Sequence, residues 1–392
     1  MRIAFLSGYD LLQPKLDRRI FIEARTCQDH GHDVEVICWA RRQKGQIPEG
    51  KYEGINFYRL YQDLGSESSS FLFKIPKYFR LMKHMLRRID EFKPDVVVAV
   101  DLEMLPVATM GKLFYNHKLI YDCHEDWPSM ELQASQSLGF FTKLLEKSLL
   151  PFVDSVITVC ETLQKRFLKA GKDSHLLMTA RTKKEISELT FISRQEVRKN
   201  LGFRDEDVLV GFLGNLKNKN LEMILEAFSH VQKTDPNSKL KLLILGNPDT
   251  ILKSLSEKAI EMNISNRVKF HSVVPYNEVH NYISALDLGI TQYNEVPWAP
   301  LALPQKIIDY FAMSVPVLTR DFYERARLVR KSKAGVVFKG GNSQNVGNAM
   351  LGLEASNLLP KLQSQAKYFF QKKLCWEEQE TKLISLLNSI DK

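Results

Sequence analysis

The sequence predicts an α/β protein in which each half of the chain forms a doubly wound parallel sheet. Three observations predict this fold. Short apolar segments alternate with helical ones from one end of the chain to the other. A polar, highly charged stretch at residues 181–207 carries no strand signal and separates two sets of such segments. The 392 residues are also enough for two domains of ordinary size.

The predicted strands are short and apolar, as expected of strands that are buried on both faces of a sheet. In the first half they cover residues 3–7, 34–38, 95–100, 118–121 and 155–159, and in the second half residues 208–213, 241–245, 268–270, 287–290, 315–318 and 335–338. We expect an N-terminal Rossmann-like domain over residues 1–185 and a C-terminal one over 186–375. Residues 376–392 are expected to form a helix that crosses back to the first domain.

Composition and cysteine usage narrow the class of protein. Hydrophobic residues make up 44% and charged residues 26% of the chain, which is typical of a globular protein. The five cysteines are odd in number and form no CxxC pair, which argues against a disulfide framework or a zinc site. The first residues do not resemble a signal peptide, and no apolar run reaches the ~18–20 residues of a membrane span. We therefore expect a cytoplasmic protein, peripheral to a membrane at most.

The formal net charge of +9 indicates a polyanionic partner, such as nucleic acid, anionic lipid or a polyphosphate ligand. The segment 72–89 shows the sharpest helical periodicity, with an apolar arc opposite a basic one. The apolar arc comprises Ile75, Tyr78, Phe79, Met82, Met85, Leu86 and Ile89. The residues predicted to face an anionic membrane are Lys74, Lys77, Arg80, Lys83 and Arg87.

Two interpretations of this helix stay open. It can simply pack on the first sheet with its basic face in water, or its basic rim can in addition contact lipid headgroups at the inner face of a membrane. Nucleic-acid binding is disfavoured, because no interleaving of aromatic and basic residues accompanies the charge.

Loops that follow strands are the candidate sites, because ligands of such sheets bind beyond the carboxyl ends of the strands. The first strand is followed by Gly8 alone, without a G-x-G-x-x-G pattern, and no G-x-x-x-x-G-K-[ST] occurs. A dinucleotide dehydrogenase and a P-loop NTPase are therefore disfavoured.

The loop at residues 121–127 carries carboxylates, an imidazole and an indole at the end of a strand. His124 can donate a hydrogen bond to a substrate hydroxyl or to a developing charge, and Glu125 or Asp126 can orient it. A polar loop in which Asp126 begins a helix is an equally good interpretation of these residues alone.

Two loops of the second half place cations beside predicted helix starts. After the strand at 208–213, Gly214 permits close backbone approach, and Lys219 lies just before the helix at 221–233, where anions are favoured. Pro304 suits the first turn of another helix, which opens with Gln305 and Lys306. Taken alone, the loop with Lys219 can equally be a loop with solvated lysines. The segment with Lys306 can equally be an ordinary amphipathic helix.

Taken in order, these segments resemble the retaining, family-four type of the GT-B glycosyltransferases. The resemblance is carried by residues 17–24 with 30–36, 95–100 with 121–125, 211–216, 268–275 with 285–290, 304–317 ("PQKIIDYFAMSVPV") and 376–379. It implies two Rossmann-like domains that face each other across a cleft. It further implies transfer of a sugar from a nucleoside-diphosphate sugar to a glycan, lipid-linked or protein acceptor, with retention of configuration, in surface polysaccharide or glycoconjugate synthesis.

The resemblance also assigns site residues. It implies that His124 and Glu125 lie near the transferred sugar, that Lys219 contacts the donor diphosphate and that Asp309 holds the ribose. The full set of implied donor-binding residues is Gly8, Gly214, Asn215, Lys219, Leu303, Pro304, Lys306 and Asp309. Arg18 is a weaker candidate for a polar contact. Cations and helix starts can stabilise a leaving diphosphate without a metal ion, so no metal or other cofactor is expected.

Three positions depart from the family pattern. Leu301 stands where many members have the first acidic residue of E-x7-E, Asn215 replaces a common arginine, and Ser314 replaces a glycine. Two alternatives to the transferase stay open: a catalytically silent partner subunit with the same fold, and a GT-B nucleotide-sugar epimerase.

Overall fold

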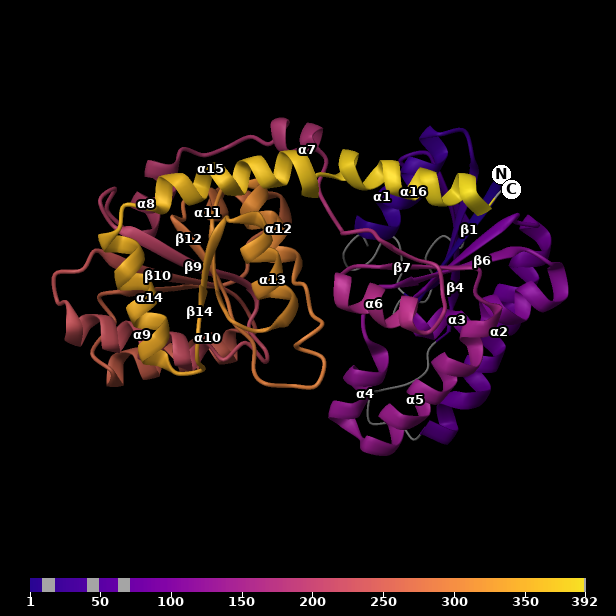
Figure 1. The fold of residues 1–392 in the computed structure, drawn as a ribbon, viewed down its shortest axis with the longest axis horizontal. Coiled ribbons are helices and arrows are strands. Elements are labelled where there is room, and N and C mark those ends of the chain that lie inside the picture. The colour runs from indigo at the N-terminus through magenta and orange to yellow at the C-terminus, as the bar shows by residue number, and fades with distance from the viewer. Residues whose placement is uncertain (9–17, 41–48, 63–70, 391–392) are drawn as a thin grey trace. The chain divides into compact units, whose positions relative to one another are not determined.

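The computed structural model describes residues 1–8, 18–40, 49–62 and 71–390; the side chains of residues 71–75 lie outside this description. The chain forms two compact units (Figure 1). The N-terminal unit comprises Met1–Thr179 and Gln379–Lys392, and the C-terminal unit comprises Ala180–Glu378.

The described part of the N-terminal unit contains an eight-stranded sheet in the order β3-β4-β2-β1-β5-β6-β7-β8, parallel except for the β3–β4 pair. Its strands are β1 (Arg2–Ser7), β2 (Asp33–Ala40), β3 (Glu49–Tyr52), β4 (Ile55–Tyr61), β5 (Val96–Val100), β6 (Lys118–Cys123), β7 (Ser155–Thr158) and β8 (Ser174–Leu176). Its helices are α1 (Arg18–Asp29), α2 (Phe71–Phe92), α3 (Asp101–Tyr115), α4 (Trp127–Ala134), α5 (Gln136–Leu149), η1 (Leu150–Phe152) and α6 (Glu161–Lys169).

Three strands of this sheet are absent from the sequence prediction. β3 and β4 form a hairpin through Glu53 and Gly54, both of which have positive φ (46° and 89°), as a tight two-residue turn requires. β3 is largely exposed, and β8 has only three residues at the other edge. These short edge strands lack the continuous apolar run by which the buried strands are identified.

The C-terminal unit contains a six-stranded parallel sheet in the order β11-β10-β9-β12-β13-β14. Its strands are β9 (Val208–Asn215), β10 (Leu240–Asn247), β11 (Val268–His271), β12 (Leu288–Thr291), β13 (Val317–Arg320) and β14 (Gly335–Phe338). Its helices are α7 (Lys183–Ser187), α8 (Arg194–Leu201), α9 (Leu221–Thr234), α10 (Asp249–Glu261), η2 (Tyr276–Glu278), α11 (Val279–Ser284), α12 (Gln305–Ala312), α13 (Tyr323–Ser332), α14 (Ser343–Ala355), α15 (Leu359–Phe369) and η3 (Phe370–Leu374).

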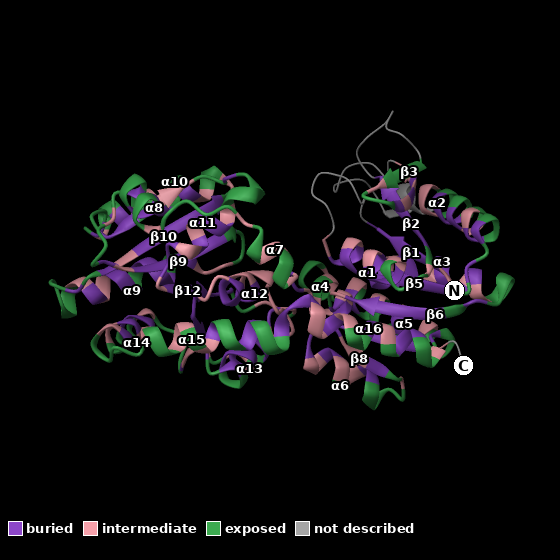
Figure 2. Cartoon of the chain, turned by 90° about the horizontal axis from the view of Figure 1, so that it is seen from above, coloured by how far each residue is buried: buried purple, intermediate pink, exposed green. Residues whose placement is uncertain are grey.

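The central strands are buried in both units (Figure 2). β13 begins two residues later than predicted, because Ser314 has a positive φ (62°) and Val315 is buried in the turn before the strand. The last helix, α16 (Trp376–Ile390), belongs to the N-terminal unit from Gln379 onward. There the buried Gln379 side chain accepts a hydrogen bond from the backbone N–H of Met178 (3.2 Å).

Candidate functional site

The loop after β6 is fixed by the residue that follows the neighbouring strand β5. Asp101 has a positive φ (59°), and its Oδ1 accepts hydrogen bonds from the backbone N–H groups of His124 (2.9 Å) and Glu125 (3.2 Å). Burial raises the pKa of Asp101, and the charge of His124 opposes that shift. Because the carboxyl ends of β5 and β6 lie side by side, Asp101 determines where His124 is placed.

His124 lies in a buried cluster of charged side chains. Its Nε2 is 2.6 Å from Asp122 Oδ2 and 2.7 Å from Arg19 Nε. One nitrogen cannot serve both neighbours: a protonated imidazole donates to Asp122, whereas a neutral one accepts from Arg19. Burial lowers the pKa of His124, but attraction to Asp122 outweighs it and raises the pKa to about 9. The protonated form, donating to Asp122, is therefore the one present near neutral pH.

Arg19 holds this cluster together. Its guanidinium contacts both carboxylate oxygens of Asp122 (2.8 and 3.3 Å), and it also donates to the carbonyl of Leu177 (2.8 Å). One helical turn further, Glu23 is fully buried 3.1 Å from Arg19, and burial raises its pKa to about 8. Burial also raises the pKa of Asp122, but Arg19 and His124 outweigh burial and hold it below its usual range.

Sequence reasoning missed Arg19 and selected its neighbour Arg18, which is half-buried. A signal was present, because Arg19 and Glu23 are opposite charges four residues apart on the apolar face of α1. Buried charges need partners, so this pair pointed to further charged groups nearby.

The assignment of Asp126 as an orienting residue for His124 is wrong. Its carboxylate is bonded to the Ser129 hydroxyl and to Arg166 (2.8 Å) at the start of α4, as the helix-start interpretation predicted. Asp122 is the carboxylate bonded to the imidazole. Glu125 is exposed, and its catalytic role stays a prediction. Gly8 is buried in the turn after β1, and the residues that follow it lie outside the described part of the chain.

In the C-terminal unit, Gly289 of β12 allows α12 to lie directly on the sheet. A Cβ at Gly289 would lie 2.4 Å from the ring of Tyr310, so a larger residue would push the ring away. The Tyr310 hydroxyl accepts a hydrogen bond from the backbone N–H of Leu213 (3.2 Å) and donates one to the carbonyl of Gly211 (3.3 Å). This seating brings Lys306, one turn before Tyr310, to the end of β9.

The ammonium group of Lys306 is buried without a hydrogen-bond partner among the described residues. Its Nζ lies 3.5 Å from the centre of the Phe212 ring. A Cβ at Gly214, where φ is 119°, would come within 3.6 Å of the same nitrogen. Burial, together with the positive charge of Lys219, holds the pKa of Lys306 well below its usual value. The end of β9 thus carries a buried amine whose charged form has no counter-ion among the described residues.

Lys219 and Arg325 both contact Tyr293, and sequence reasoning missed the ring and the arginine. Lys219 Nζ is 3.6 Å from the ring centre, and Arg325 Cζ is 4.5 Å from it. Arg325 also donates to the carbonyl of Ala299 (2.9 Å), and burial lowers its pKa to about 10. Trp298 packs edge-to-face against Tyr293, with 5.6 Å between ring centres. Aromatic faces attract cations that lie over them.

The remaining predicted donor residues surround these cations. Asn215 is exposed at the end of β9, and its Oδ1 accepts a hydrogen bond from the backbone N–H of Lys217 (2.9 Å). Leu303 and Pro304 are half-buried in the segment that enters α12. α12 begins at Gln305, as predicted, and Pro304 stands at the position just before it with an extended backbone.

Asp309, the predicted ribose-binding residue, is already in an ion pair. Arg181 Nε donates to its carboxylate (2.8 Å), and Arg181 Nη2 donates to the hydroxyl of Tyr276 (2.7 Å). Neither partner was predicted, because Arg181 lies far from Asp309 in the sequence, in a stretch that looks like a linker. The described residues contain no group of three or more His, Cys, Asp or Glu side chains arranged to hold a metal ion.

The helix predicted to face a membrane, α2, packs against α3 and β4. Met82, Met85 and Ile89 are buried as expected, but Phe79 is 60% exposed, so its place on the buried arc is wrong. The buried arc is centred closer to Met85, with Phe79 at its margin.

The basic residues of α2 differ in their surroundings. Arg80, Lys83 and Arg87 are exposed, Lys77 is half-buried, and the side chain of Lys74 lies outside the description. Arg88 instead pairs with Glu35 of the sheet (2.6 Å). Across the described residues, no helix has the length and apolarity that would let it pass through a bilayer.

Comparison with known proteins places both units in glycosyltransferase families. Residues 193–371 match the family described as Glycosyl transferases group 1, and residues 17–177 match Glycosyltransferase Family 4. The chain is similar to the chitobiosyldiphosphodolichol beta-mannosyltransferase of Candida albicans, with 24% identity over 60% of this chain and 54% of that protein, so it spans about half of that relative's length. It is also similar to the putative teichuronic acid biosynthesis glycosyltransferase TuaH of Bacillus subtilis, with 26% identity over 78% of this chain and 77% of that one.

Solved structures share the fold over the full length. The Anabaena protein HepE in complex with UDP has a TM-score of 0.75 at 17% identity, covering 99% of this chain and 100% of that one. Sucrose-phosphate synthase of Thermosynechococcus elongatus has a TM-score of 0.76 at 14% identity, covering 99% and 98%. These likenesses confirm the predicted fold, two Rossmann-like parallel-sheet domains of the GT-B type.

Proposed function

Because this chain belongs to the GT-B glycosyltransferases of the family-four type, we propose that it transfers a sugar from a nucleoside-diphosphate sugar to an acceptor with retention of configuration. The acceptor is a glycan, a lipid-linked sugar or a protein, in surface polysaccharide or glycoconjugate synthesis. The same proposal places the enzyme at the inner face of a membrane, where the basic side chains of α2 contact anionic lipid.

The observation that carries the proposal is the unpaired ammonium of Lys306. A buried charge without a counter-ion is costly, and a second cation, Lys219, lowers its pKa further. A diphosphate bound at the end of β9 would remove this penalty, because its oxygens can accept hydrogen bonds from both ammonium groups.

The same cations would serve the chemistry. Negative charge builds on the diphosphate as the bond to the sugar breaks, and fixed cations stabilise that charge without rearranging. Lys219, Lys306 and the start of α12 would supply this stabilisation, so the proposed donor site works without a metal ion. The HepE structure, which is a complex with UDP, supports a nucleotide ligand for this fold.

His124 is the proposed catalytic group of the N-terminal unit, with Glu125 beside it. Its imidazolium, held by Asp122, would donate a hydrogen bond to the transferred sugar rather than accept a proton. Asp309 would hold the ribose, with Arg181 keeping its carboxylate ionised and oriented.

The experiment is a donor screen followed by a matched pair of variants. Purified protein is incubated with UDP- and GDP-sugars, and nucleotide release, free sugar and isomerised donor are measured. We expect nucleotide release with at least one donor, and a fall in its rate of about 100-fold in Lys219→Ala. Lys217→Ala, an exposed lysine of the same loop, is expected to match the wild type.

Other outcomes would replace the proposal. Isomerised donor without net nucleotide release would establish an epimerase. Complete inactivity, with no thermal shift from any nucleotide sugar, would leave the silent partner subunit, which the Leu301 and Asn215 departures favour. Equal rates for Lys219→Ala and Lys217→Ala would remove the diphosphate from this loop.

A further inference from the structure

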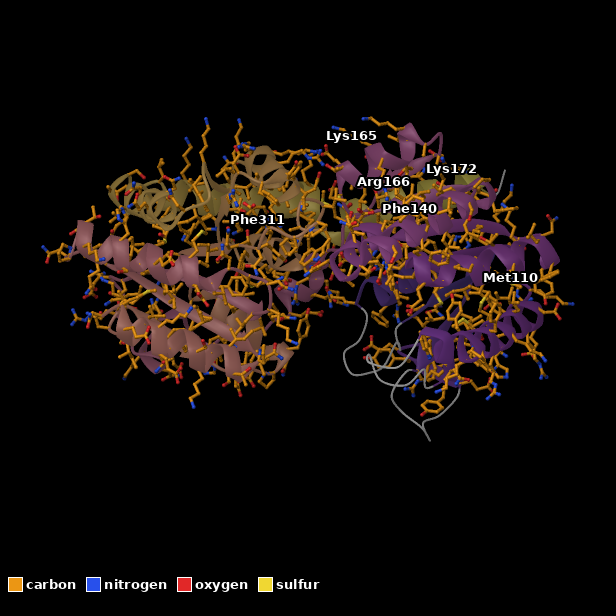
Figure 3. All side chains as sticks on the ribbon, turned by 90° about the horizontal axis from the view of Figure 1, so that it is seen from below. Met110, Phe140, Lys165, Arg166, Lys172 and Phe311 are labelled. Carbon is orange, nitrogen blue, oxygen red and sulfur yellow. The ribbon has the colours of Figure 1, made fainter. Side chains whose placement is uncertain are left out.

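The helical hairpin α4–α5 exposes several large apolar side chains on one short segment of the N-terminal unit. They are Met130 (39% exposed), Leu132 (44%), Phe140 (68%), Phe141 (52%) and Leu144 (55%). Single exposed apolar residues are ordinary on protein surfaces, but a cluster of this kind marks a contact surface. Figure 3 shows Phe140 on this hairpin.

The hairpin is tightly packed, so it presents these side chains on a fixed support. A Cβ at Gly139 would lie 2.7 Å from the Cα of Leu132, which shows how closely the two helices approach. The Thr142 hydroxyl donates to the carbonyls of Leu138 (2.9 Å) and Gly139 (3.0 Å) on the same helix.

α5 has half-buried leucines at positions 138, 145 and 149, but large apolar side chains also occupy its exposed positions. The two buried residues of this helix are Gly139 and Glu146, while its phenylalanines face outward. Glu146 accepts hydrogen bonds from Arg166 (3.0 Å) and from the Tyr121 hydroxyl (3.2 Å). Polar contacts thus fasten the inner face of α5, and its apolar face is left for a partner outside the unit.

The charge around the apolar cluster fits a negatively charged partner. Lys143 and Lys147 are exposed on α5, whose one carboxylate, Glu146, is buried; on α4 the carboxylate of Glu131 is half-buried. The neighbouring helix α3, which contacts both α2 and α5, ends with Phe114 exposed (67%). Apolar side chains bordered by lysines are typical of helices that lie in the interface of an anionic bilayer.

We propose that the α4–α5 hairpin docks on an anionic lipid bilayer. Phe140, Phe141 and Leu144 insert among the upper acyl chains, and Lys143 and Lys147 contact lipid phosphates. The partner is the lipid surface itself, because exposed apolar side chains and exposed lysines occur together on α5.

The position of the hairpin links this contact to the candidate site. α4 begins at Trp127, three residues after His124, so a docked hairpin holds the predicted catalytic loop at the lipid surface. This consequence, which rests on the proposed function, makes an amphiphile embedded in the bilayer the acceptor class. The lipid contact itself does not depend on any activity.

The test is vesicle binding by the full chain. Co-sedimentation is measured with vesicles of phosphatidylcholine mixed with phosphatidylglycerol, and with vesicles of phosphatidylcholine alone. We expect binding to the anionic vesicles that weakens with salt, and a loss of about tenfold or more in the double variant Phe140→Ser, Phe141→Ser. Tyr368→Ser, at a residue of α15 that is 59% exposed, is the matched control and is expected to bind as the wild type does.

Several results would overturn the proposal. Wild-type protein that ignores anionic vesicles at low salt would do so, as would unchanged binding in the double variant. If Phe79→Ser on α2 abolishes binding and the hairpin variant does not, the docking surface is α2 instead. A dimer that dissociates in the hairpin variant would assign the apolar face to a second copy of the chain. Unchanged unfolding temperature in the variants shows that the fold is intact, and nucleotide release by unbound protein tests the proposed function separately.

Discussion

At the scale of single residues, the two candidate charges are held in opposite ways. Lys306 carries a buried amine with no counter-ion among the described residues, so its charged form is disfavoured until an anion binds beside it. His124 carries a buried imidazolium that Asp122 stabilises, so its charge is already compensated. The surroundings of Lys306 suit a group that binds an anionic ligand. Those of His124 suit a group whose orientation is fixed before the ligand binds.

Replacing Lys306 with methionine separates ligand binding from stability. Lys306→Met removes the buried unpaired charge and keeps most of the side-chain volume, so we expect the unfolding free energy to stay equal or to rise by about 1–2 kcal/mol. We expect the thermal stabilisation by UDP to disappear. Differential scanning fluorimetry with and without UDP measures both; a less stable variant that still responds to UDP would contradict the prediction.

The pKa of His124 predicts a pH dependence of stability. Its folded-state pKa is raised from 6.5 to about 9, so the protonated imidazole stabilises the fold fully below pH 6.5, and this stabilisation is lost as the pH rises to about 9. The size is of the order of 2–3 kcal/mol. Urea unfolding across this range is expected to show the decline in the wild type and less of it in His124→Gln.

Glu23 is the control for this pH profile. Burial raises its pKa from 4.5 to about 8, so its own contribution falls between pH 4.5 and 8. Glu23→Gln should flatten the profile between pH 4.5 and 6.5 and leave the fall between pH 6.5 and 9 that belongs to His124. A profile for His124→Gln that matches the wild type at every pH would show that folding does not raise the pKa of the imidazole.

At the scale of elements, the donor-side arrangement depends on how α12 lies on its sheet. Glycine at position 289 lets the Tyr310 ring rest on the strand, and the Tyr310 hydroxyl bonds to the backbone of β9. Lys306 precedes Tyr310 by one turn, so it is positioned by this packing rather than by its own contacts. The placement of α12 is therefore set by the absence of a side chain on β12.

Gly289→Ala tests this dependence. The added Cβ would lie 2.4 Å from the Tyr310 ring, so α12 must move, and we expect a loss of roughly 1–3 kcal/mol in stability together with weaker UDP binding. Gly352→Ala in α14 is the matched control. Nothing lies within 4 Å of its Cβ position, so we expect the variant to be about 0.5–1 kcal/mol more stable, with unchanged UDP binding. Chemical denaturation and calorimetric titration check both expectations.

At the scale of the whole molecule, the segment that enters the C-terminal unit lies beside the segment that leaves it. The backbone N–H of Trp376 donates to the carbonyl of Arg181 (2.9 Å). The side chain of Arg181 meanwhile holds Asp309 and bonds to Tyr276. Arg181, the second residue of this unit, is thus part of its candidate donor site and orients Asp309, the carboxylate proposed to bind the ribose.

Arg181→Gln is expected to weaken donor binding about five- to thirtyfold, because Asp309 loses its charge-assisted hydrogen bond and its fixed orientation. Tyr276→Phe removes only the hydroxyl that accepts from Arg181 and is expected to weaken binding less. Titration calorimetry with the donor found in the screen measures both. A stronger effect from Tyr276→Phe would place the recognition on the tyrosine instead.

Local patterns predicted much of the architecture. Strands buried on both faces must be apolar along their whole length, so β1, β5 and β9 are visible in the sequence, and the alternation with helices gives the fold class. Edge strands such as β3 and β8 are not predicted in this way, because they are partly exposed to solvent and so need not be apolar along their whole length. The loops that carry His124, Lys219 and Lys306 also follow from the sequence, since loops after parallel strands end at one edge of the sheet.

The tertiary structure alone decided which side chains meet. Arg19 and Asp122 are 103 positions apart, and their ion pair exists because the fold brings the start of α1 to the end of β6. The amine of Lys306 is buried because Gly289, on β12, lets α12 pack closely on the sheet. On α5, the same phenylalanines that would be assigned to a core are exposed, and a glutamate is buried. Sequence periodicity records which face of an element is apolar, but the neighbours of that face are set by strand order and helix packing, which no local pattern contains.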